Sequence, residues 1–403
     1  MNWPPDAKLP RAAAKHPPNR SLTSNLAWGQ VQTGRDGARF SQIPTGEYFP
    51  SRPRTESQAN ATVESPKAQG RWDILAWNFI GPGSLAPGIL PRQWHRELDS
   101  PNFAFVSPAE IGQDRVLARE VLQTLDPRPG QTCIDCTLGR GGHSSLIAPL
   151  LGPSGLIVGI DVDPNNLEFA RARLADSPCP VRFFHANFAE ISEVLVEVGQ
   201  SKADLVLADL GLSTNQFFDE RYGLSFSQAM PLDMRIDPRL TQTAADLVNS
   251  LREEDLANVL YELAQERYSR RIARKVVEAR RLAPITSTER LAELVRSVVP
   301  RSGHDKIDPA TRTFMALRMA VNREMENLDA LLKQAPHCLR SGGRMAVISF
   351  QSMEDRRVKQ AFRSAEQTGL LRVLTKKPLT PTDDELARNP RARSAKMRAG
   401  QRV

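Results

Sequence analysis

The segment CIDCTLGRGGHSSLIAPLLGPSGLIVGID, residues 133–161, decides the fold of this 403-residue chain. Its first apolar run predicts a buried strand, GRGGHS predicts a turn, and SSLIAPLL predicts a helix that ends at Gly152. The next apolar run, GLIVGID, predicts a second strand that ends at Asp161. This order of strand, turn, helix and strand predicts one unit of a parallel sheet with helices on its faces.

The turn and the acidic residue at the end of this segment predict a site for a nucleoside cofactor. Glycines between a strand and a helix let the backbone approach a ligand closely, and the helix N-terminus presents free N–H groups. A carboxylate at the strand tip, here Asp161, can accept hydrogen bonds from both ribose hydroxyls. The layout suits either a dinucleotide or S-adenosylmethionine, but Ser144 breaks the G-x-G-x-x-G spacing of a pyrophosphate-binding turn.

Cys133 and Cys136 form a C-x-x-C inside the first predicted strand, where residues three apart point to opposite faces. A redox pair normally lies at a helix N-terminus, and the chain's four cysteines leave no second pair to complete a zinc site. We therefore expect buried packing cysteines and no metal site. So few cysteines in a chain of this length fit a reducing cytoplasm.

Strands and helices continue to alternate on the C-terminal side of the segment. Residues 164–175 predict a helix, and residues 181–188 and 203–211 predict two further strands. Residues from about 215 to 307 are mainly helical in pattern, and GGRMAVISF, residues 342–350, then predicts another strand. We interpret this order as an α/β, doubly wound sheet that is interrupted once and then resumed.

These patterns predict the following domains. The sheet domain comprises residues 106–214 and 308–403, and residues 215–307 form an inserted helical substrate domain. Within the second part of the sheet domain, residues 311–335 predict one long amphipathic helix. Residues 1–105 are rich in Pro, Ser, Asn, Gln and Arg and show no sustained period, so they predict a mostly disordered extension.

Composition predicts a cytoplasmic protein with a polyanionic partner. The first residues have no apolar segment behind their charges, unlike a secretory signal, and no run approaches the length of a membrane helix. The net charge is +8 and the isoelectric point about 9.5. Basic residues cluster at 267–281 and at 376–398, which favours contacts with a phosphate backbone, although solvated helix faces often carry such runs.

Two further segments can contribute to a reaction. DLVLADLGLSTNQ, residues 204–216, places Asp209 at the carboxyl end of a predicted strand, where open α/β sheets bind ligands. Residues 221–237 are too polar and too rich in turn formers to be core, so they predict a loop whose Asp233 and Arg235 could hold a base and a phosphate. An ordinary polar strand end and an ordinary solvated loop are the alternatives.

Several motifs in one order resemble the MraW/RsmH family of bacterial methyltransferases, which methylate cytosine N4 in 16S ribosomal RNA. The resemblance spans residues from about 110 to 403 and is carried by GRGGHS, GIDVDP, ADLGLSTNQ, MPLDMRID, PATRTFMALR, VISF followed by EDR, and NPRARSAK. It implies a Rossmann-like class I S-adenosylmethionine methyltransferase sheet with an inserted helical domain. It also implies S-adenosylmethionine as the cofactor and 16S rRNA or the small ribosomal subunit as the partner.

The resemblance assigns cofactor contacts by motif. These residues are Gly141, Gly142, His143, Asp161, Phe188, Asp209 and Gln216. For catalysis we predict Asp209 and Asp233. A cytosine amine is a poor nucleophile, so the enzyme must hold it in line with the methyl group while a carboxylate accepts an amine hydrogen bond. The target base must be flipped out or already unpaired.

The chain departs from the family pattern at three histidines. Gln113, Asp308 and Gln351 stand where the family's motifs usually have histidine. The cofactor motifs are not affected. We therefore expect the departures to concern RNA positioning or the acceptor rather than methyl transfer itself.

Two other functions remain open at this stage. An NAD-dependent oxidoreductase would use the same glycine turn and Asp161, but the segments MPLDMRID and NPRARSAK have no place in it. A non-catalytic or re-targeted RNA-binding or ribosome-assembly protein could have kept the cofactor pocket. Comparing the binding of S-adenosylmethionine with that of NAD would distinguish a methyltransferase from the oxidoreductase. An assay of methyl transfer to small ribosomal subunits would distinguish it from the non-catalytic protein.

Overall fold

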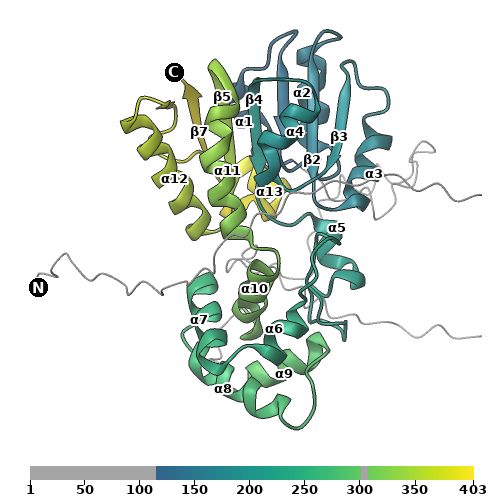
Figure 1. Cartoon of the computed structure of the whole chain (residues 1–403), viewed down its shortest axis with the longest axis vertical. Coiled ribbons are helices and arrows are strands. Elements are labelled where there is room, and N and C mark those ends of the chain that lie inside the picture. Colours follow the sequence, from purple (N-terminus) through teal and green to yellow (C-terminus); the bar gives the residue numbers. More distant parts are fainter. Residues whose placement is uncertain (1–114, 301–306) are drawn as a thin grey trace, which may run out of the picture. The chain divides into compact units, whose positions relative to one another are not determined.

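One mixed sheet forms the centre of the described structure. The computed structural model describes residues 115–300 and 307–403, and the predicted extension, residues 1–105, lies outside them. The sheet has the order β3-β2-β1-β4-β5-β7-β6 (Figure 1). Its strands are β1 (Thr132–Asp135), β2 (Leu156–Asp161), β3 (Val181–His185), β4 (Ala203–Asp209), β5 (Leu339–Ser349), β6 (Leu371–Val373) and β7 (Lys396–Arg402). Strands β1 to β5 are parallel and β7 is antiparallel to β5 and β6, which confirms the predicted doubly wound sheet.

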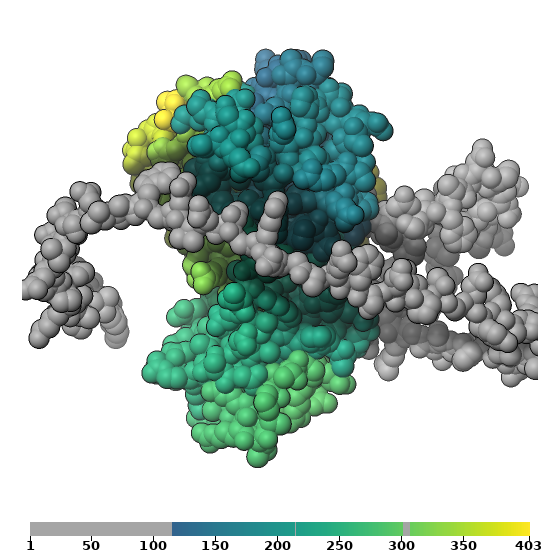
Figure 2. All heavy atoms as spheres, turned by 45° about the vertical axis from the view of Figure 1, so that its right-hand side comes forward, coloured from purple at the N-terminus to yellow at the C-terminus, as the bar shows by residue number. Residues whose placement is uncertain are grey.

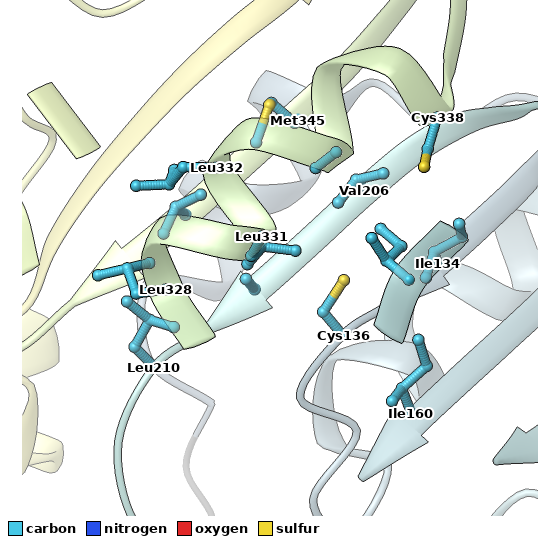
Figure 3. Packing of buried hydrophobic residues seen from close by; sticks show 14 of the residues in the cluster. Ile134, Cys136, Ile160, Val206, Leu210, Leu328, Leu331, Leu332, Cys338 and Met345 are labelled. Atoms are coloured by element: carbon cyan, nitrogen blue, oxygen red, sulfur yellow. The ribbon is translucent and has the colours of Figure 1, made fainter. Parts of the chain in front are cut away.

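Helices cover both faces of this sheet. On one face α4 (Ile191–Glu197), α11 (Glu324–Cys338) and α12 (Ser352–Gln367) share an apolar core with the strands. Figure 3 shows the part of this core in which Leu328, Leu331 and Leu332 of α11 lie over the strands. On the other face α1 (Ala118–Leu125) and α2 (Gly142–Leu151) share a second apolar core with them. Burial of apolar surface on both faces explains why the strand sequences are continuously apolar rather than alternating.

The cysteines belong to these two cores. Cys136 packs on the face covered by α11, and Cys133 packs on the opposite face, as expected for residues three apart in an extended segment. All four cysteines are buried and free. The prediction of packing cysteines is therefore confirmed.

Local sequence explains how two helices begin beside the carboxyl ends of the strands. Gly141 precedes α2 with φ 76°, a conformation that favours glycine, and a Cβ there would lie 3.1 Å from Leu174 Cδ1. Pro164 occupies the first turn of α3 (Pro164–Arg173), and the Asp163 side chain caps that helix. Both helix N-termini thus lie at one edge of the sheet, where the predicted cofactor turn lies.

Between β4 and β5 the chain builds a separate helical core (Figures 1 and 2). The helices that contribute to it are α6 (Ala244–Ser250), α7 (Glu253–Ala264), α8 (Ser269–Arg280), α9 (Thr288–Val298) and α10 (Ala310–Val321). Within the region predicted to be mainly helical, α7 is capped at its C-terminus by Gln265, whose φ is 52°, and α8 begins four residues later at Ser269. The predicted domain boundary at residue 308 stays a prediction, although α10 beyond it packs in the helical core.

The loop at residues 221–237 differs from its prediction. It was expected to be too polar to be core, which is wrong, because Leu224, Phe226, Leu232 and Met234 are buried among the helices. Its apolar residues follow neither a helical nor a strand period, so the pattern did not indicate their burial. The loop therefore joins the helical core to the edge of the sheet.

The single long helix predicted at residues 311–335 is also wrong. The chain forms α10 and α11 instead, with a break at Arg323, where φ is 49°. Asn322 holds the break through hydrogen bonds with the Ile236 N–H, at 2.9 Å, and the Met234 carbonyl, at 2.8 Å. The apolar period runs across the break because α10 packs mainly in the helical core and α11 packs on the sheet.

Short elements complete the described structure. They are α5 (Thr214–Phe218), α13 (Asp383–Arg388), and the single-turn helices η1 (Phe188–Glu190), η2 (Glu220–Tyr222) and η3 (Pro390–Ser394). Within the described ranges, no helix combines the length and the apolar character that crossing a membrane requires.

Candidate functional site

A cavity of about 830 Å³ opens at the carboxyl ends of β1, β2 and β4. Open α/β sheets bind ligands at this edge, and pockets for small molecules measure roughly 300–1,000 Å³. We use two names for its sides. The sheet wall consists of Gly139, His143, Asp161 and Asp209. The helix wall consists of Arg318, Asn322, Glu324 and Glu354.

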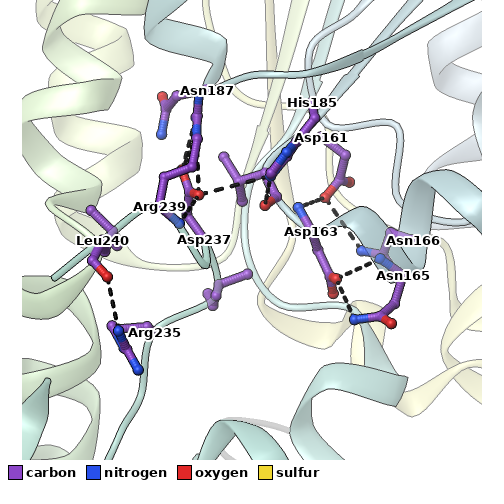
Figure 4. Close-up of polar contacts among 12 residues, drawn as sticks. Asp161, Asp163, Asn165, Asn166, His185, Asn187, Arg235, Asp237, Arg239 and Leu240 are labelled. Atoms are coloured by element: carbon purple, nitrogen blue, oxygen red, sulfur yellow. Dashed lines mark hydrogen bonds and ion pairs between the residues drawn. The ribbon is translucent and has the colours of Figure 1, made fainter. Parts of the chain in front are cut away.

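Asp161 lies at the tip of β2 and is held by backbone donors. Its Oδ2 accepts the Gly139 N–H at 2.7 Å. Its Oδ1 accepts the Asp163 N–H at 2.8 Å (Figure 4). Burial raises the pKa of Asp161 to about 7, and the two N–H donors oppose that shift. A carboxylate offers about four acceptor positions, so Asp161 can still accept the two hydroxyls of a ribose.

His143 and Asp209 form a pair on the same wall. His143 Nε2 lies 3.4 Å from Asp209 Oδ2, and the imidazole belongs to a residue only 8% exposed. Burial lowers the pKa of His143, but Asp209 and Asp135 raise it by more, so the net shift is upward. Three buried atoms of the pair have no hydrogen-bond partner among the described residues. They are Nδ1 and Nε2 of His143 and Oδ1 of Asp209.

Three more of the predicted cofactor residues line the cavity. Gly142 begins α2, and Phe188 lies in η1 beyond β3. Gln216 is buried, and its side chain already bridges Asp163, through Nε2 at 2.8 Å, and the Ser213 N–H, through Oε1 at 3.1 Å. The structure thus brings six of the seven predicted contact residues to one cavity, five of them at strand ends or helix starts.

The seventh predicted cofactor residue, Gly141, and the predicted catalytic residue Asp233 lie outside the cavity lining. Gly141 is not among the residues lining the cavity, and its place against Leu174 makes it a determinant of the turn's shape. Asp233 is also absent from the large cavity and borders a smaller one of about 190 Å³. Its carboxylate forms an ion pair with Arg235 at 2.7 Å. The structure therefore does not bring Asp233 together with Asp209.

The helix wall contains charged residues to which the sequence analysis gave no role. Arg318 pairs with Glu324 through two hydrogen bonds, at 2.7 and 2.9 Å, and its side chain is 12% exposed. Glu354 is buried and accepts the N–H groups of Phe350 and Gln351. Burial, reinforced by the charge of Glu324, raises the pKa of Glu354 to about 7. The motifs around these residues were visible in the sequence, but the three charged residues lie on three different helices, α10, α11 and α12.

Two of the three positions that lack the family's histidine can be located. Gln351 lines the cavity and caps α12 together with Glu354. Asp308 lies outside the cavity lining, where it pairs with Arg296 at 2.9 Å and accepts the Ala310 N–H. Gln113 lies outside the described residues. Of the two replacements within the described residues, Gln351 is therefore the one that borders the site.

The sheet wall fits S-adenosylmethionine by its unsatisfied groups. Asp161 offers acceptors for ribose hydroxyls. His143 and Asp209, which have buried polar atoms without a hydrogen-bond partner among the described residues, line the same cavity. Buried polar atoms without partners are rare in folded proteins and indicate a place where a ligand completes the hydrogen bonds. No group of three or more potential metal ligands occurs within residues 115–300 and 307–403.

Comparison with known proteins assigns the chain to a family. The model of the family described as "MraW methylase family" matches residues 110–403. The chain belongs to the MraW methylase family. The resemblance inferred from the motifs is therefore confirmed, and with it a methyltransferase that uses S-adenosylmethionine. Nothing in the comparisons favours an NAD-dependent oxidoreductase or a non-catalytic protein.

Individual relatives extend this result. The chain is 46% identical over 293 residues to a protein of Acidobacterium capsulatum named "Ribosomal RNA small subunit methyltransferase H", covering 71% of this chain and 97% of the relative. Relatives of the same name occur in a Cyanothece species, at 46% identity over 72% of this chain and 94% of the relative. A third, in Syntrophotalea carbinolica, is 45% identical over 72% of this chain and 97% of the relative.

Proposed function

We propose that this methyltransferase transfers the methyl group of S-adenosylmethionine to N4 of a cytosine in 16S rRNA, within the small ribosomal subunit in the cytoplasm. The observation that carries the proposal is the pair of carboxylates on the sheet wall of the cavity. Asp161, at the end of β2, can bind a ribose, and Asp209, at the end of β4, has an oxygen without a hydrogen-bond partner among the described residues. Only β1 lies between these two strands in the sheet. Relatives named for the small-subunit rRNA, of which the chain covers 97% and 94%, supply the substrate class.

The sheet wall would hold the cofactor. Asp161 would accept the ribose hydroxyls, and Phe188 and Gly142, which line the same cavity, would contact the rest of the cofactor. When bound, the cofactor supplies an electrophilic methyl group on a positively charged sulfur. Gln216 holds the loop after β4 in place, because its side chain hydrogen-bonds both to Ser213 in that loop and to Asp163, the residue that caps α3.

Asp209 would orient the acceptor amine. Its free Oδ1 lies at the carboxyl end of β4, and the Asp209 N–H donates to Thr137 Oγ1 at 2.6 Å, which fixes this strand end to the turn after β1. Accepting one amine hydrogen directs the nitrogen lone pair toward the methyl group, and such positioning supplies most of the rate. We do not extend the catalytic proposal to Asp233, because its carboxylate is paired with Arg235 beside a separate cavity.

The RNA would reach the cavity across basic surfaces. The helix α8 carries exposed arginines, among them Arg270, Arg271 and Arg274, and the C-terminal segment adds Arg391, which lines the cavity. Contacts of this kind bind phosphates without reading the sequence, so the choice of nucleotide depends on the cavity. We therefore expect binding of the ribosomal particle to weaken as the salt concentration rises.

Transfer of a labelled methyl group to small ribosomal subunits tests the proposal. The wild-type protein should label the 16S rRNA of the particle, and digestion should yield N4-methylated cytidine. Asp209→Ala should lower kcat at least about 100-fold, because one positioned hydrogen-bonding group contributes about that much, while the Kd for S-adenosylmethionine changes less than about fivefold. The exposed Asp176 provides a matched control, and Asp176→Asn should change neither quantity.

Two outcomes would contradict the proposed function or the proposed role of Asp209. Label in neither the particle nor free rRNA would favour the binding-protein alternative. Loss of cofactor binding without any further loss of kcat in Asp209→Ala would remove Asp209 from the acceptor role and leave it a cofactor ligand only.

A further inference from the structure

The pair formed by His143 and Asp209 points to a role beyond cofactor binding, and the inference rests on the proposed function. We propose that His143 takes up, through Asp209, the proton that the acceptor amine releases during methyl transfer. Asp209 touches the amine in this scheme. His143 does not, so it is a positioning and proton-accepting residue one step removed from the reacting atoms.

The first support is the set of unsatisfied atoms on the sheet wall. His143 Nδ1, His143 Nε2 and Asp209 Oδ1 are buried without a hydrogen-bond partner in the described part of the chain. A histidine that serves only as packing normally satisfies at least one ring nitrogen, because burial of an unpaired polar group is unfavourable. His143 lines the cavity and is more than nine-tenths buried, so its imidazole is held where a proton can reach it from Asp209 but not readily from bulk water.

The second support is the geometry of the pair. Nε2 and Oδ2 are 3.4 Å apart, within ion-pair distance but outside good hydrogen-bond geometry. Catalytic hydrogen bonds are often long before the substrate binds and shorten in the complex. The other oxygen, Oδ1, is the free one, so the carboxylate has one oxygen for the histidine and one for the amine.

The third support is the charge around the imidazole. The groups that face it are the carboxylates of Asp209, Asp135 and Glu385 and the guanidinium of Arg115. Asp135 already accepts Ser144 Oγ–H at 2.7 Å and the Thr137 N–H, so it acts on His143 only through space. Acidic groups therefore outnumber basic ones around the ring, and this surrounding favours the protonated imidazole that the scheme requires.

The proposed step balances as follows. As the nitrogen–carbon bond forms, the carbon–sulfur bond breaks and its electron pair remains on sulfur. The positively charged acceptor nitrogen gives one proton to Asp209 Oδ1. The neutral carboxyl group then rotates about its Cβ–Cγ bond and passes this same proton to His143 Nε2, which returns Asp209 to a carboxylate. The imidazolium releases the proton to water after the product leaves.

The pH dependence of kcat tests the role of His143. With saturating cofactor and ribosomal particle, wild-type kcat should fall as the pH drops through the pKa of His143, since a protonated ring cannot accept another proton. His143→Gln keeps a polar atom near the position of Nε2 but cannot take up the proton. We expect its kcat at pH 8 to fall about tenfold, its acidic limb to vanish, and the Kd for S-adenosylmethionine to stay within about threefold of wild type.

An exposed histidine provides the control. His337→Gln, at the end of α11, should retain the wild-type profile. An acidic limb that persists in His143→Gln would belong to another group, such as Glu354, and would overturn the proposal. A His143→Gln variant that loses cofactor binding but keeps its kcat would overturn it as well, because the side chain would then act as a cofactor ligand.

A second measurement does not depend on turnover. Nuclear magnetic resonance of the imidazole, assigned by the signal that His143→Gln lacks, should give a pKa above 6.5 in the wild-type protein and a lower one in Asp209→Asn. Equal values in both proteins would refute the coupling between the two residues. If the wild-type protein methylates no ribosomal particle, the proposed function fails, and this titration still decides whether the pair exists.

Discussion

The two walls of the cavity are held in place by different kinds of interaction. On the sheet wall, backbone N–H groups of Gly139 and Asp163 hold Asp161, and the Thr137 hydroxyl accepts the N–H of Asp209. On the helix wall, the ion pair of Arg318 and Glu324 joins the ends of two helices beside a second carboxylate, that of Glu354. The backbone of the sheet therefore shapes the cofactor side, whereas a few buried charges shape the opposite side.

This difference implies that the walls respond differently to substitution. Backbone donors remain when a neighbouring side chain changes, so the sheet wall should keep its shape through many substitutions. A buried ion pair leaves an uncompensated charge when one partner is removed. Substitutions on the helix wall should therefore lower mainly the free energy of unfolding. Substitutions on the sheet wall should change mainly the affinity for the cofactor.

The largest expected effect comes from removing the cation of the helix wall. Arg318→Met leaves the carboxylates of Glu324 and Glu354 without their guanidinium, so the free energy of unfolding should fall by about 3–5 kcal/mol. Urea unfolding measures this change. In the control Arg290→Met, which breaks an exposed pair with Glu293, the loss should be under about 1 kcal/mol. Equal losses in both variants would show that the two walls do not differ in this way.

A smaller effect is expected from a change of pH, which should alter the affinity of the sheet wall for S-adenosylmethionine. Because the pKa of Asp161 is raised to about 7 and the ionised carboxylate accepts the ribose hydroxyls, cofactor affinity should increase as the pH rises through 7. Between pH 6 and pH 8 the ionised fraction changes about tenfold, and the affinity should follow it. Isothermal titration calorimetry with S-adenosylmethionine measures the Kd across this range.

The same titration has an internal control. Asp161→Asn cannot ionise, so its Kd should be about 100-fold higher than that of wild type at pH 8, and this part of the pH dependence should be absent. A wild-type affinity that is constant from pH 6 to pH 8 would contradict the proposed role of the ionised carboxylate.

The smallest effect is expected where the chain departs from its family beside the cavity. Gln351→His restores the histidine of the family's motif at a position that caps α12 and borders the cavity. The Kd for the cofactor should stay within about twofold, because the sheet wall is untouched, and the KM for the ribosomal particle should change by less than about threefold. Steady-state kinetics with the particle as the varied substrate would reveal a larger effect and assign Gln351 a role in RNA positioning.

Much of the sheet wall could be predicted from the sequence because its elements are local. Strand β1, the glycine turn, helix α2 and strand β2 follow one another within residues 132–161, and short-range periodicity and turn chemistry specify each of them. Asp161 and Asp209 both end apolar runs, so their place at the ligand-binding edge followed from the parallel order of the strands. The family motifs then distinguished the cofactor.

The helix wall and the shape of the acceptor side depended on tertiary structure. The break at Arg323 has no local signal, because α10 and α11 both continue the same apolar period while packing in different cores. The position of Glu354 beside the pair of Arg318 and Glu324, and the separation of Asp233 from Asp209, likewise depend on contacts between distant segments.

The sequence by itself thus determined the doubly wound sheet, the position of the cofactor turn and the family. Only the tertiary structure decided which charged residues meet across the cavity. The physical reason is that hydrogen bonding and hydrophobic period act between near neighbours in the chain, whereas burial and charge pairing act between residues that the fold alone brings together.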